Sequence, residues 1–201
     1  ASALPIASIR FDNTPDAFIP EGHPALEAKE RVEREFGLRD PMILALTTTE
    51  TDGIFRPGPM RRLKEITDEI LGTLRDMERS GEIPPLGDHP VYSIATESAV
   101  FTEGDIPVEF PFLEPFPETP EDFRRLKAAI LDLELYTGVI VSEDGSAAAV
   151  VVMPPPGHAE PVFQRMEEIA RRARSKRGPG ESLHLAGEAA VRSAMGYAVA
   201  R

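Results

Sequence analysis

The segment MILALTTTETDGIFRPGPMRRLKEITDEILGTLRDM, residues 42–77, decides the fold class, because it holds a strand and a long helix in succession. Its first part is an apolar and then β-branched run, which is typical of a buried strand. After a turn, large apolar residues recur at steps of three and four, as on one face of an amphipathic helix. These residues are Met60, Leu63, Ile66, Ile70, Leu74 and Met77. Ser80 and Gly81 are expected to end the helix.

Similar patterns predict further elements on both sides of this segment. Strands are expected at 6–11, 91–100, 138–141, 147–153 and 182–186, and helices at 23–36, 119–133, 159–174 and 187–201. Asp144 and Gly145 supply a hairpin turn between two β-prone runs. Helical crossovers between strands of one sheet predict an α+β fold, in which helices pack on a mixed sheet.

The composition is that of a folded domain with an acidic surface. Of 201 residues, 41% are hydrophobic and 28% are charged, which leaves enough apolar material for a core. The net charge of −12 predicts no nucleic-acid partner, because binding to phosphates needs clustered Lys and Arg. An uncharged lipid stays possible as a ligand, since its affinity comes from apolar burial. No apolar run reaches the roughly 18 to 20 residues that span a bilayer.

No motif of an enzyme, a metal site or a nucleotide cofactor is found in the sequence. The absence of cysteine excludes thiolate catalysis and zinc–thiolate sites. The four histidines stand apart, and no HExxH, GxSxG, GxGxxG or Walker pattern occurs. Acidic pairs such as Asp68-Glu69 fall on polar helix faces, where solvation explains them. We therefore expect no enzyme activity, no metal and no cofactor.

The loop VEFPFLEPFPETP, residues 108–120, combines prolines with large apolar side chains. Proline fixes φ and lacks an N–H, so neither a helix nor a central strand is expected here. The apolar side chains could fold back as a satellite core, as most aromatic clusters do. They could also form the wall of an apolar pocket or a contact surface for a partner. The prolines slightly favour these last two, since they hold side chains out at low entropic cost.

Several motifs, taken in order, resemble one family. Asp12-Asn13-Thr14, the FIPE motif of 18–21 and Phe36-Gly37 are similar to the extracytoplasmic segment after the first transmembrane helix of resistance-nodulation-division (RND) exporters. The likeness is to the branch of mycobacterial membrane-protein-large (MMPL) transporters and hopanoid exporters. It continues in DPMILALTTTETDGIFRPGPMRRLKEITDEI, VYSIATES, SEDGSAAAVVV and LHLAGEAAVRSAM, and so covers nearly the whole chain.

The resemblance implies a periplasmic porter domain of a bacterial inner-membrane lipid transporter, built from βαβ modules of ferredoxin-like type. It divides the chain into a membrane-proximal strand and helix (1–37), an α+β core (38–186) and a helix leading to the next transmembrane segment (187–201). The implied cargo is a hydrophobic polycyclic lipid, such as a sterol or a hopanoid. Further implied partners are a periplasmic lipid-binding or adaptor protein and the rest of the transporter. No transport is expected of this chain alone, because the family's proton-relay residues lie within the membrane.

The candidate ligand-binding residues are mostly large and apolar: Phe110, Phe112, Leu113, Phe116, Tyr136, Met153 and Phe163. A buried ligand hydroxyl would need a partner, because leaving it unpaired costs roughly 1 to 3 kcal/mol. The Tyr136 hydroxyl or a loop backbone group could supply that partner. The alternative is a docking module that contacts an adaptor or a partner loop without binding lipid. An enclosed cavity would favour cargo, whereas a flat apolar patch would favour a protein partner.

Overall fold

The computed structural model describes residues 19–20, 22–36, 41–103 and 106–191 of the chain. The predicted strand at 6–11 and the helix beyond residue 191 lie outside this part. The elements are α1 (Pro24–Phe36), β1 (Met42–Thr48), α2 (Pro57–Ser80), β2 (Val91–Tyr92), β3 (Ser98–Glu103), β4 (Ile106–Pro111), α3 (Pro120–Leu131), β5 (Ala147–Val152), α4 (Ala159–Ser175) and β6 (Glu181–Ala186). The predicted α+β class is confirmed.

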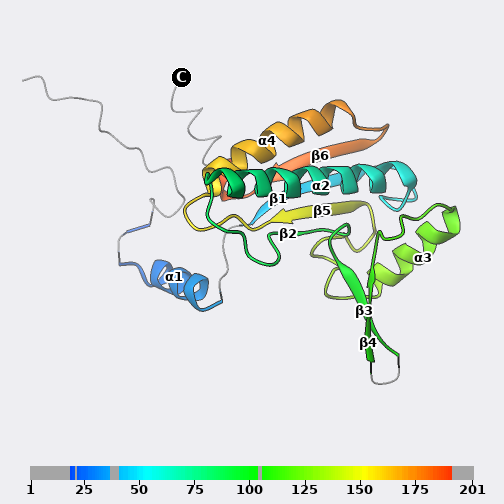
Figure 1. Cartoon of the computed structure of the whole chain (residues 1–201), viewed down its shortest axis with the longest axis horizontal. Coiled ribbons are helices and arrows are strands. Elements are labelled where there is room, and N and C mark those ends of the chain that lie inside the picture. Colours follow the sequence, from blue (N-terminus) through cyan, green and yellow to red (C-terminus); the bar gives the residue numbers. More distant parts are fainter. Residues whose placement is uncertain (1–18, 21, 37–40, 104–105, 192–201) are drawn as a thin grey trace, which may run out of the picture.

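The main sheet has the strand order β2-β5-β1-β6, and each neighbouring pair in it is antiparallel. Strands β1 and β2 are therefore parallel, are joined by α2 and have β5 between them. Strands β5 and β6 are likewise parallel, are joined by α4 and have β1 between them (Figure 1). Two such split βαβ units make a ferredoxin-like fold. The expectation of a mixed sheet is corrected, because each helical crossover skips one strand.

Helices α2 and α4 lie side by side on one face of this sheet (Figure 1). Alternate residues of β1 and β5 point into the layer between sheet and helices, among them Leu44, Leu46, Val150 and Val152. All six apolar residues that the periodicity predicts for α2 are buried. The inward face of α4 is buried as well and consists of Phe163, Met166, Ile169, Ala170 and Ala173. Each fully buried large side chain stabilises the fold by roughly 1.5 to 3 kcal/mol.

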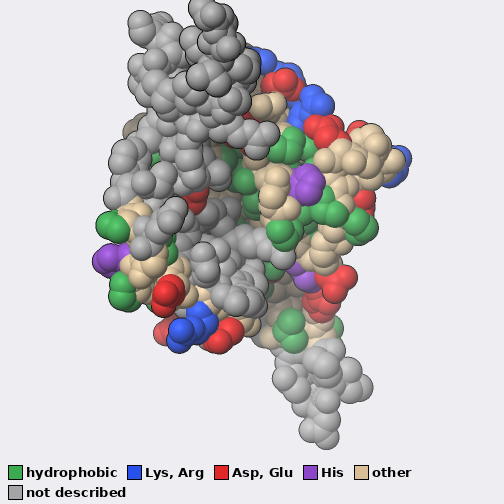
Figure 2. All heavy atoms as spheres, turned by 90° about the vertical axis from the view of Figure 1, so that its left-hand side faces the viewer, with side chains coloured by type: hydrophobic (Ala, Val, Ile, Leu, Met, Phe, Trp, Pro, Cys, Tyr) green, Lys and Arg blue, Asp and Glu red, His purple; other side chains and the backbone are tan. Residues whose placement is uncertain are grey.

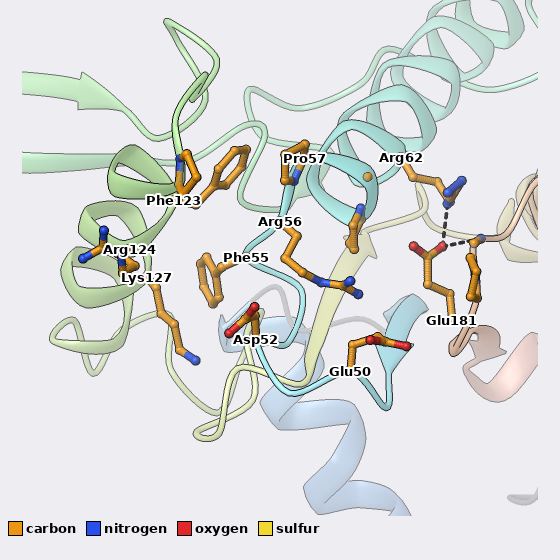
Figure 3. Close-up of a pocket in the computed structure, with 15 residues that line it drawn as sticks. Glu50, Asp52, Phe55, Arg56, Pro57, Arg62, Phe123, Arg124, Lys127 and Glu181 are labelled. Atoms are coloured by element: carbon orange, nitrogen blue, oxygen red, sulfur yellow. Dashed lines mark hydrogen bonds and ion pairs between the residues drawn. The ribbon is translucent and has the colours of Figure 1, made fainter.

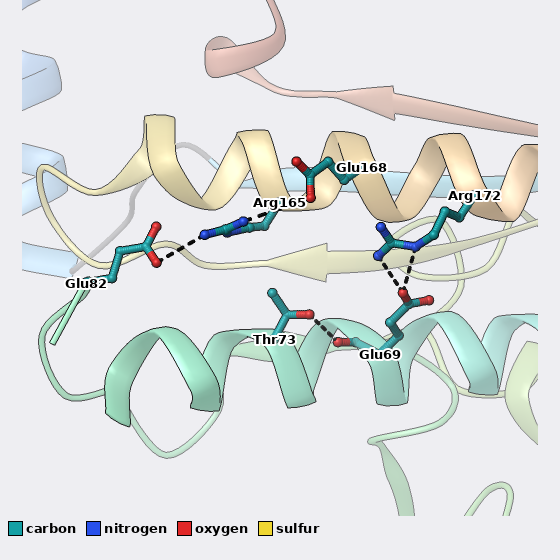
Figure 4. A network of polar contacts seen from close by, with 6 residues as sticks. All are labelled: Glu69, Thr73, Glu82, Arg165, Glu168 and Arg172. Atoms are coloured by element: carbon teal, nitrogen blue, oxygen red, sulfur yellow. Dashed lines mark hydrogen bonds and ion pairs between the residues drawn. The ribbon is translucent and has the colours of Figure 1, made fainter. Parts of the chain in front are cut away.

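Ion pairs join α2 to α4 along their exposed edge (Figure 4). Arg172 binds Glu69 at 2.6 Å, and Arg165 lies 3.4 Å from Glu82, which follows the end of α2. These pairs are solvent-exposed, so each contributes only about 0 to 1 kcal/mol. The two helices are therefore held together chiefly by their buried faces.

The predicted strand 91–100 is divided between two sheets. Strand β2 ends before Ser93, whose buried hydroxyl lies 3.0 Å from that of Thr67 on α2. The Ser93 N–H donates to the Thr96 hydroxyl at 2.9 Å and so closes a turn. Strand β3 follows this turn and pairs with β4 in a hairpin that projects from the layers (Figure 1).

Strand β4 corrects the expectation that all of residues 108–120 would form a loop. Its residues extend to Pro111, and β3 is its one partner within the described residues. A proline is tolerated here because an edge strand need not donate from every N–H. The expected hairpin at 138–153 is also shorter than predicted, since Val141 makes only an isolated bridge to Ala148.

The predicted start of α3 is confirmed. The Thr119 hydroxyl oxygen accepts from the Asp122 N–H at 3.2 Å, and the Asp122 carboxylate accepts from the Thr119 N–H at 2.9 Å. This reciprocal pair is a capping box, in which each side chain satisfies a backbone donor of the first turn. The hydrogen bonds from Thr119 lower the pKa of Asp122.

Strand β1 begins and strand β6 finishes at the same end of the main sheet. At one end Ile43, near the start of β1, pairs with Ala186, the last residue of β6. At the other end Thr48 pairs with Glu181. Figure 2 views the molecule from the end at which β6 finishes and α4 begins, and there the described acidic, basic and hydrophobic side chains are interspersed. The chain therefore enters and leaves its core at a single end.

We expect Gly53→Ala to destabilise the fold, whereas Gly72→Ala should stabilise it. Gly53 has φ +68°, and a Cβ there would lie 2.1 Å from the carbonyl oxygen of Gly145. A backbone strain of this kind costs about 1 to 3 kcal/mol. Gly72 lies within α2 with open space at its Cβ, so alanine should add up to about 1 kcal/mol. Urea unfolding measures both changes, and a stable Gly53→Ala variant would contradict the described turn contact.

Candidate functional site

A cleft of about 810 Å³ lies between the ferredoxin-like core and the insertion formed by residues 93–146. Three separate segments line it: the loop from β1 into the first turns of α2, helix α3, and the loop before β6 (Figure 3). Glu50 and Glu181 belong to this lining, so the cleft lies at the end of the sheet opposite to the Ile43–Ala186 pair.

The apolar part of the lining consists of phenylalanine and proline side chains. Phe55 and Phe123 are buried beneath the surface of the cleft. The four proline rings belong to three elements and are Pro57, Pro59, Pro120 and Pro179. Proline at the first positions of α2 and α3 fits the helix start, where the missing N–H costs nothing. These rings have little side-chain entropy to lose, so the walls are pre-organised for an apolar ligand.

A buried ion pair fixes one side of the cleft. The Arg62 guanidinium on α2 donates to the Glu181 carboxylate at 2.8 Å. Glu181 also accepts from the N–H of Gly178 at 2.9 Å, and Arg62 donates to the carbonyl of Lys176 at 2.6 Å. Both side chains are satisfied by these contacts, so their part is to hold the loop before β6 against α2.

Four further charged side chains of the cleft form no ion pair with a described residue: Glu50, Asp52, Arg56 and Lys127. The Asp52 carboxylate and the Lys127 ammonium group make neither a hydrogen bond nor an ion pair there, although the ammonium lies 5.9 Å from the ring centre of Phe55. The Arg56 guanidinium donates to the carbonyl oxygen of Gly53 and to the Thr48 hydroxyl, at 3.1 and 3.3 Å. This part of the cleft therefore offers both a cation and a carboxylate to a ligand.

Asp52 and Lys127 come to the same region of the cleft through a contact between two turns. Gly53, which follows Asp52, packs on Gly145, and the next N–H, that of Ile54, donates to the Gly145 carbonyl oxygen at 2.9 Å. A Cβ added at Gly145 would lie 3.4 Å from Lys127 Nζ. Figure 3 shows Asp52 and Lys127 beside Phe55.

The seven side chains predicted to bind ligand are spread over several places. Phe112 and Leu113 are buried in the core, and the Phe112 ring meets the Tyr136 ring edge-on at 5.3 Å. This is the satellite packing that the loop sequence left open. Phe163 is buried on the inward face of α4. Met153 is half-buried and its N–H bonds to the carbonyl of a proline before β2.

Tyr136 has already used its hydroxyl proton within the fold. The hydroxyl donates to the carbonyl oxygen of Ser98 at 2.9 Å. Burial raises the pKa of Tyr136, and the charge of Glu97 raises it further, so the phenol stays protonated. It could therefore accept a hydrogen bond from a ligand but could not donate one without breaking its own.

Phe110 and Phe116 are not among the buried members of the predicted set. Phe110 is 53% exposed on β4. Phe116 lines a smaller hollow of about 490 Å³, where the Arg61 guanidinium lies 5.5 Å from its ring centre. The Phe116 ring also meets Phe123 at 6.0 Å, and Phe123 lines the larger cleft. Among the predicted residues, Phe116 thus contacts the lining of the cleft through the ring of Phe123.

The principal residues of the cleft were not predicted from the sequence. Residues 51–59, TDGIFRPGP, were expected only to form a turn, although they include Phe55, Pro57 and Pro59. The same combination of phenylalanine and proline had drawn attention to residues 108–120 and could have identified this second loop. No feature of the sequence near Lys127 indicates that this residue lines the cleft, because its position depends on how α3 packs.

Comparison of the sequence with protein-family models and with curated proteins finds no match. Within the described residues, no helix combines the length and the apolar content that crossing a membrane requires. The same part of the chain contains no group of three histidine, aspartate or glutamate side chains that could hold a metal ion. The cleft is therefore interpreted from its own geometry and charge.

We expect Phe112→Ala to lower the free energy of unfolding by about 3 to 5 kcal/mol, because the substitution leaves a cavity in the core. The matched substitution Phe110→Ala removes a half-exposed ring and should cost less than about 1 kcal/mol. Denaturant unfolding of the two variants measures both values. Equal losses would show that the residues after β4 pack differently from this structure.

Proposed function

We propose that this chain is the periplasmic substrate-binding, or porter, domain of an RND-type inner-membrane lipid transporter. Its ligand is a hydrophobic polycyclic lipid, such as a sterol or a hopanoid. The observation that carries the proposal is the cleft, whose volume of about 810 Å³ lies within the range of about 300 to 1,000 Å³ usual for ligand sites. Its rigid phenylalanine and proline walls suit a flat, inflexible ring system. The ferredoxin-like topology agrees with the fold that the sequence resemblance implies.

The path of the chain supports placing the domain between two membrane helices. Ile43 and Ala186 are paired neighbours, so the segments that lead into and out of the core begin at one end of the sheet. The cleft lies at the other end, beside Glu181. In a transporter the cleft would then face away from the membrane. A ligand held there would be accessible to a periplasmic lipid-binding or adaptor protein.

Filling the cleft tests this proposal. Gly58 lines the cleft in the first turn of α2, and a Cβ there meets no atom within 4 Å. Gly58→Trp should therefore occupy the cleft without disturbing the core, and we expect it to weaken lipid binding at least about tenfold, a loss of about 1.4 kcal/mol. Gly72→Trp is the matched control, because it adds the same side chain to the same helix away from the cleft.

The measurement is equilibrium binding of cholesterol, a hopanoid, a phospholipid and a hydrophobic drug to the purified chain. Saturable binding that prefers a polycyclic lipid and is lost only in Gly58→Trp supports the proposal. If the chain binds no polycyclic lipid saturably, the proposal is wrong. If both tryptophan variants bind as the parent does, the lipid site is not this cleft.

A docking module without lipid is the second candidate, and the β3–β4 hairpin is the observation that favours it. The hairpin projects from the layers (Figure 1). Val100 is 65% exposed and Phe110 is 53% exposed. An isolated two-stranded hairpin is only marginally stable in water, so a partner surface would stabilise it. Val100→Ser should then weaken the association of the chain with an adaptor protein.

A further inference from the structure

One region of the cleft carries an acceptor and a donor, each without a partner in the described residues. The acceptor is the Asp52 carboxylate, and the donor is the Lys127 ammonium group. Their N–O distance exceeds the 4 Å of an ion pair, so they do not neutralise each other directly. The buried ring of Phe55 lies beside both of them (Figure 3).

We propose that the polar end of the ligand is a neutral hydroxyl group, which donates to Asp52 and accepts from Lys127. This inference rests on the proposed function and specifies the class of ligand for the same cleft. A hydroxyl is both a donor and an acceptor, so it can serve the two side chains at once. Hydrogen bonds to charged groups are also stronger than those between neutral groups.

Other polar groups satisfy this pair less well. A ligand carboxylate, phosphate or sulfate would be attracted by Lys127 but repelled by Asp52. A ligand amine would be attracted by Asp52 but repelled by Lys127. A ketone can only accept, so it would bond to Lys127 and leave the exposed Asp52 carboxylate to water. A hydrocarbon would use neither side chain. The pair therefore selects a polycyclic alcohol among lipids of similar shape.

The remaining charges of the cleft are directed elsewhere. Arg62 is paired with Glu181, and Arg124 with Glu121 at 2.6 Å. The Glu50 carboxylate lies toward Gly180, where an added Cβ would be 3.2 Å from Glu50 Oε1. The Arg56 guanidinium makes two hydrogen bonds, to Gly53 and Thr48, and points away from Lys127 (Figure 3). Asp52 and Lys127 are thus the two groups that are left for a ligand beside α3.

The test measures binding of four sterol probes that differ at one end: cholesterol, cholestenone, cholesteryl sulfate and cholestane. We expect cholesterol to bind about tenfold more tightly than cholestane, with the ketone between them and the sulfate weaker than the alcohol. Asp52→Asn should reduce the preference for cholesterol over its sulfate, because the repelling charge is removed. Lys127→Met should bring the ketone to the affinity of the hydrocarbon. Asp132→Asn is the matched control, since this exposed residue at the end of α3 does not line the cleft.

The outcomes separate this inference from the proposed function. If none of the four probes binds saturably to the parent chain, the proposed function fails and the inference fails with it. If all four bind equally, or if the sulfate binds most tightly, lipid binding stands and the hydroxyl inference is overturned. A uniform loss for all four probes in Asp52→Asn also overturns it, because a hydroxyl partner must not alter cholestane binding. Urea unfolding that matches the parent chain is the independent check that each variant is folded.

Discussion

The contact between the turns at Gly53 and Gly145 is the constraint on which the cleft depends. The Ile54 N–H donates to the Gly145 carbonyl oxygen at 2.9 Å, and no side chain fits between the two backbones. This contact attaches the insertion to the loop between β1 and α2. It also determines where Phe55, Asp52 and Lys127 lie relative to one another. The insertion is held as well by the buried face of α3, whose Phe123, Leu126 and Ile130 belong to the core.

The opposite side of the cleft is fixed by a different kind of interaction. Glu181 is buried, and a buried carboxylate must be paired if it is to remain charged at low cost. Arg62 and the Gly178 N–H supply its partners, and in doing so they hold the loop before β6. One wall thus depends on a close backbone approach and the other on a satisfied ion pair. Both are rigid features, so the cleft is formed before any ligand arrives.

The periodicity of α2 and α4 and the apolar, β-branched runs of β1 and β5 were sufficient to predict these core elements, because each element has one face buried in a single layer. The break between β2 and β3 was not predictable in this way. It depends on the buried contact of Ser93 with Thr67, which are far apart in the sequence. The cleft was missed for the same reason, since its lining comes from three distant segments. Only the proline and phenylalanine content of residues 51–59 was visible locally.

The charge of the cleft differs from that of the chain, and this difference bears on the ligand. The chain has a net charge of −12. The lining contains four cationic side chains (Arg56, Arg62, Arg124 and Lys127) and three carboxylates (Glu50, Asp52 and Glu181), which gives +1. The acidic surface would disfavour the approach of an anion, while the nearly balanced lining gives an anion little net attraction once it arrives. A neutral ligand with a single bifunctional polar group meets neither obstacle, and its affinity would come mainly from the apolar walls.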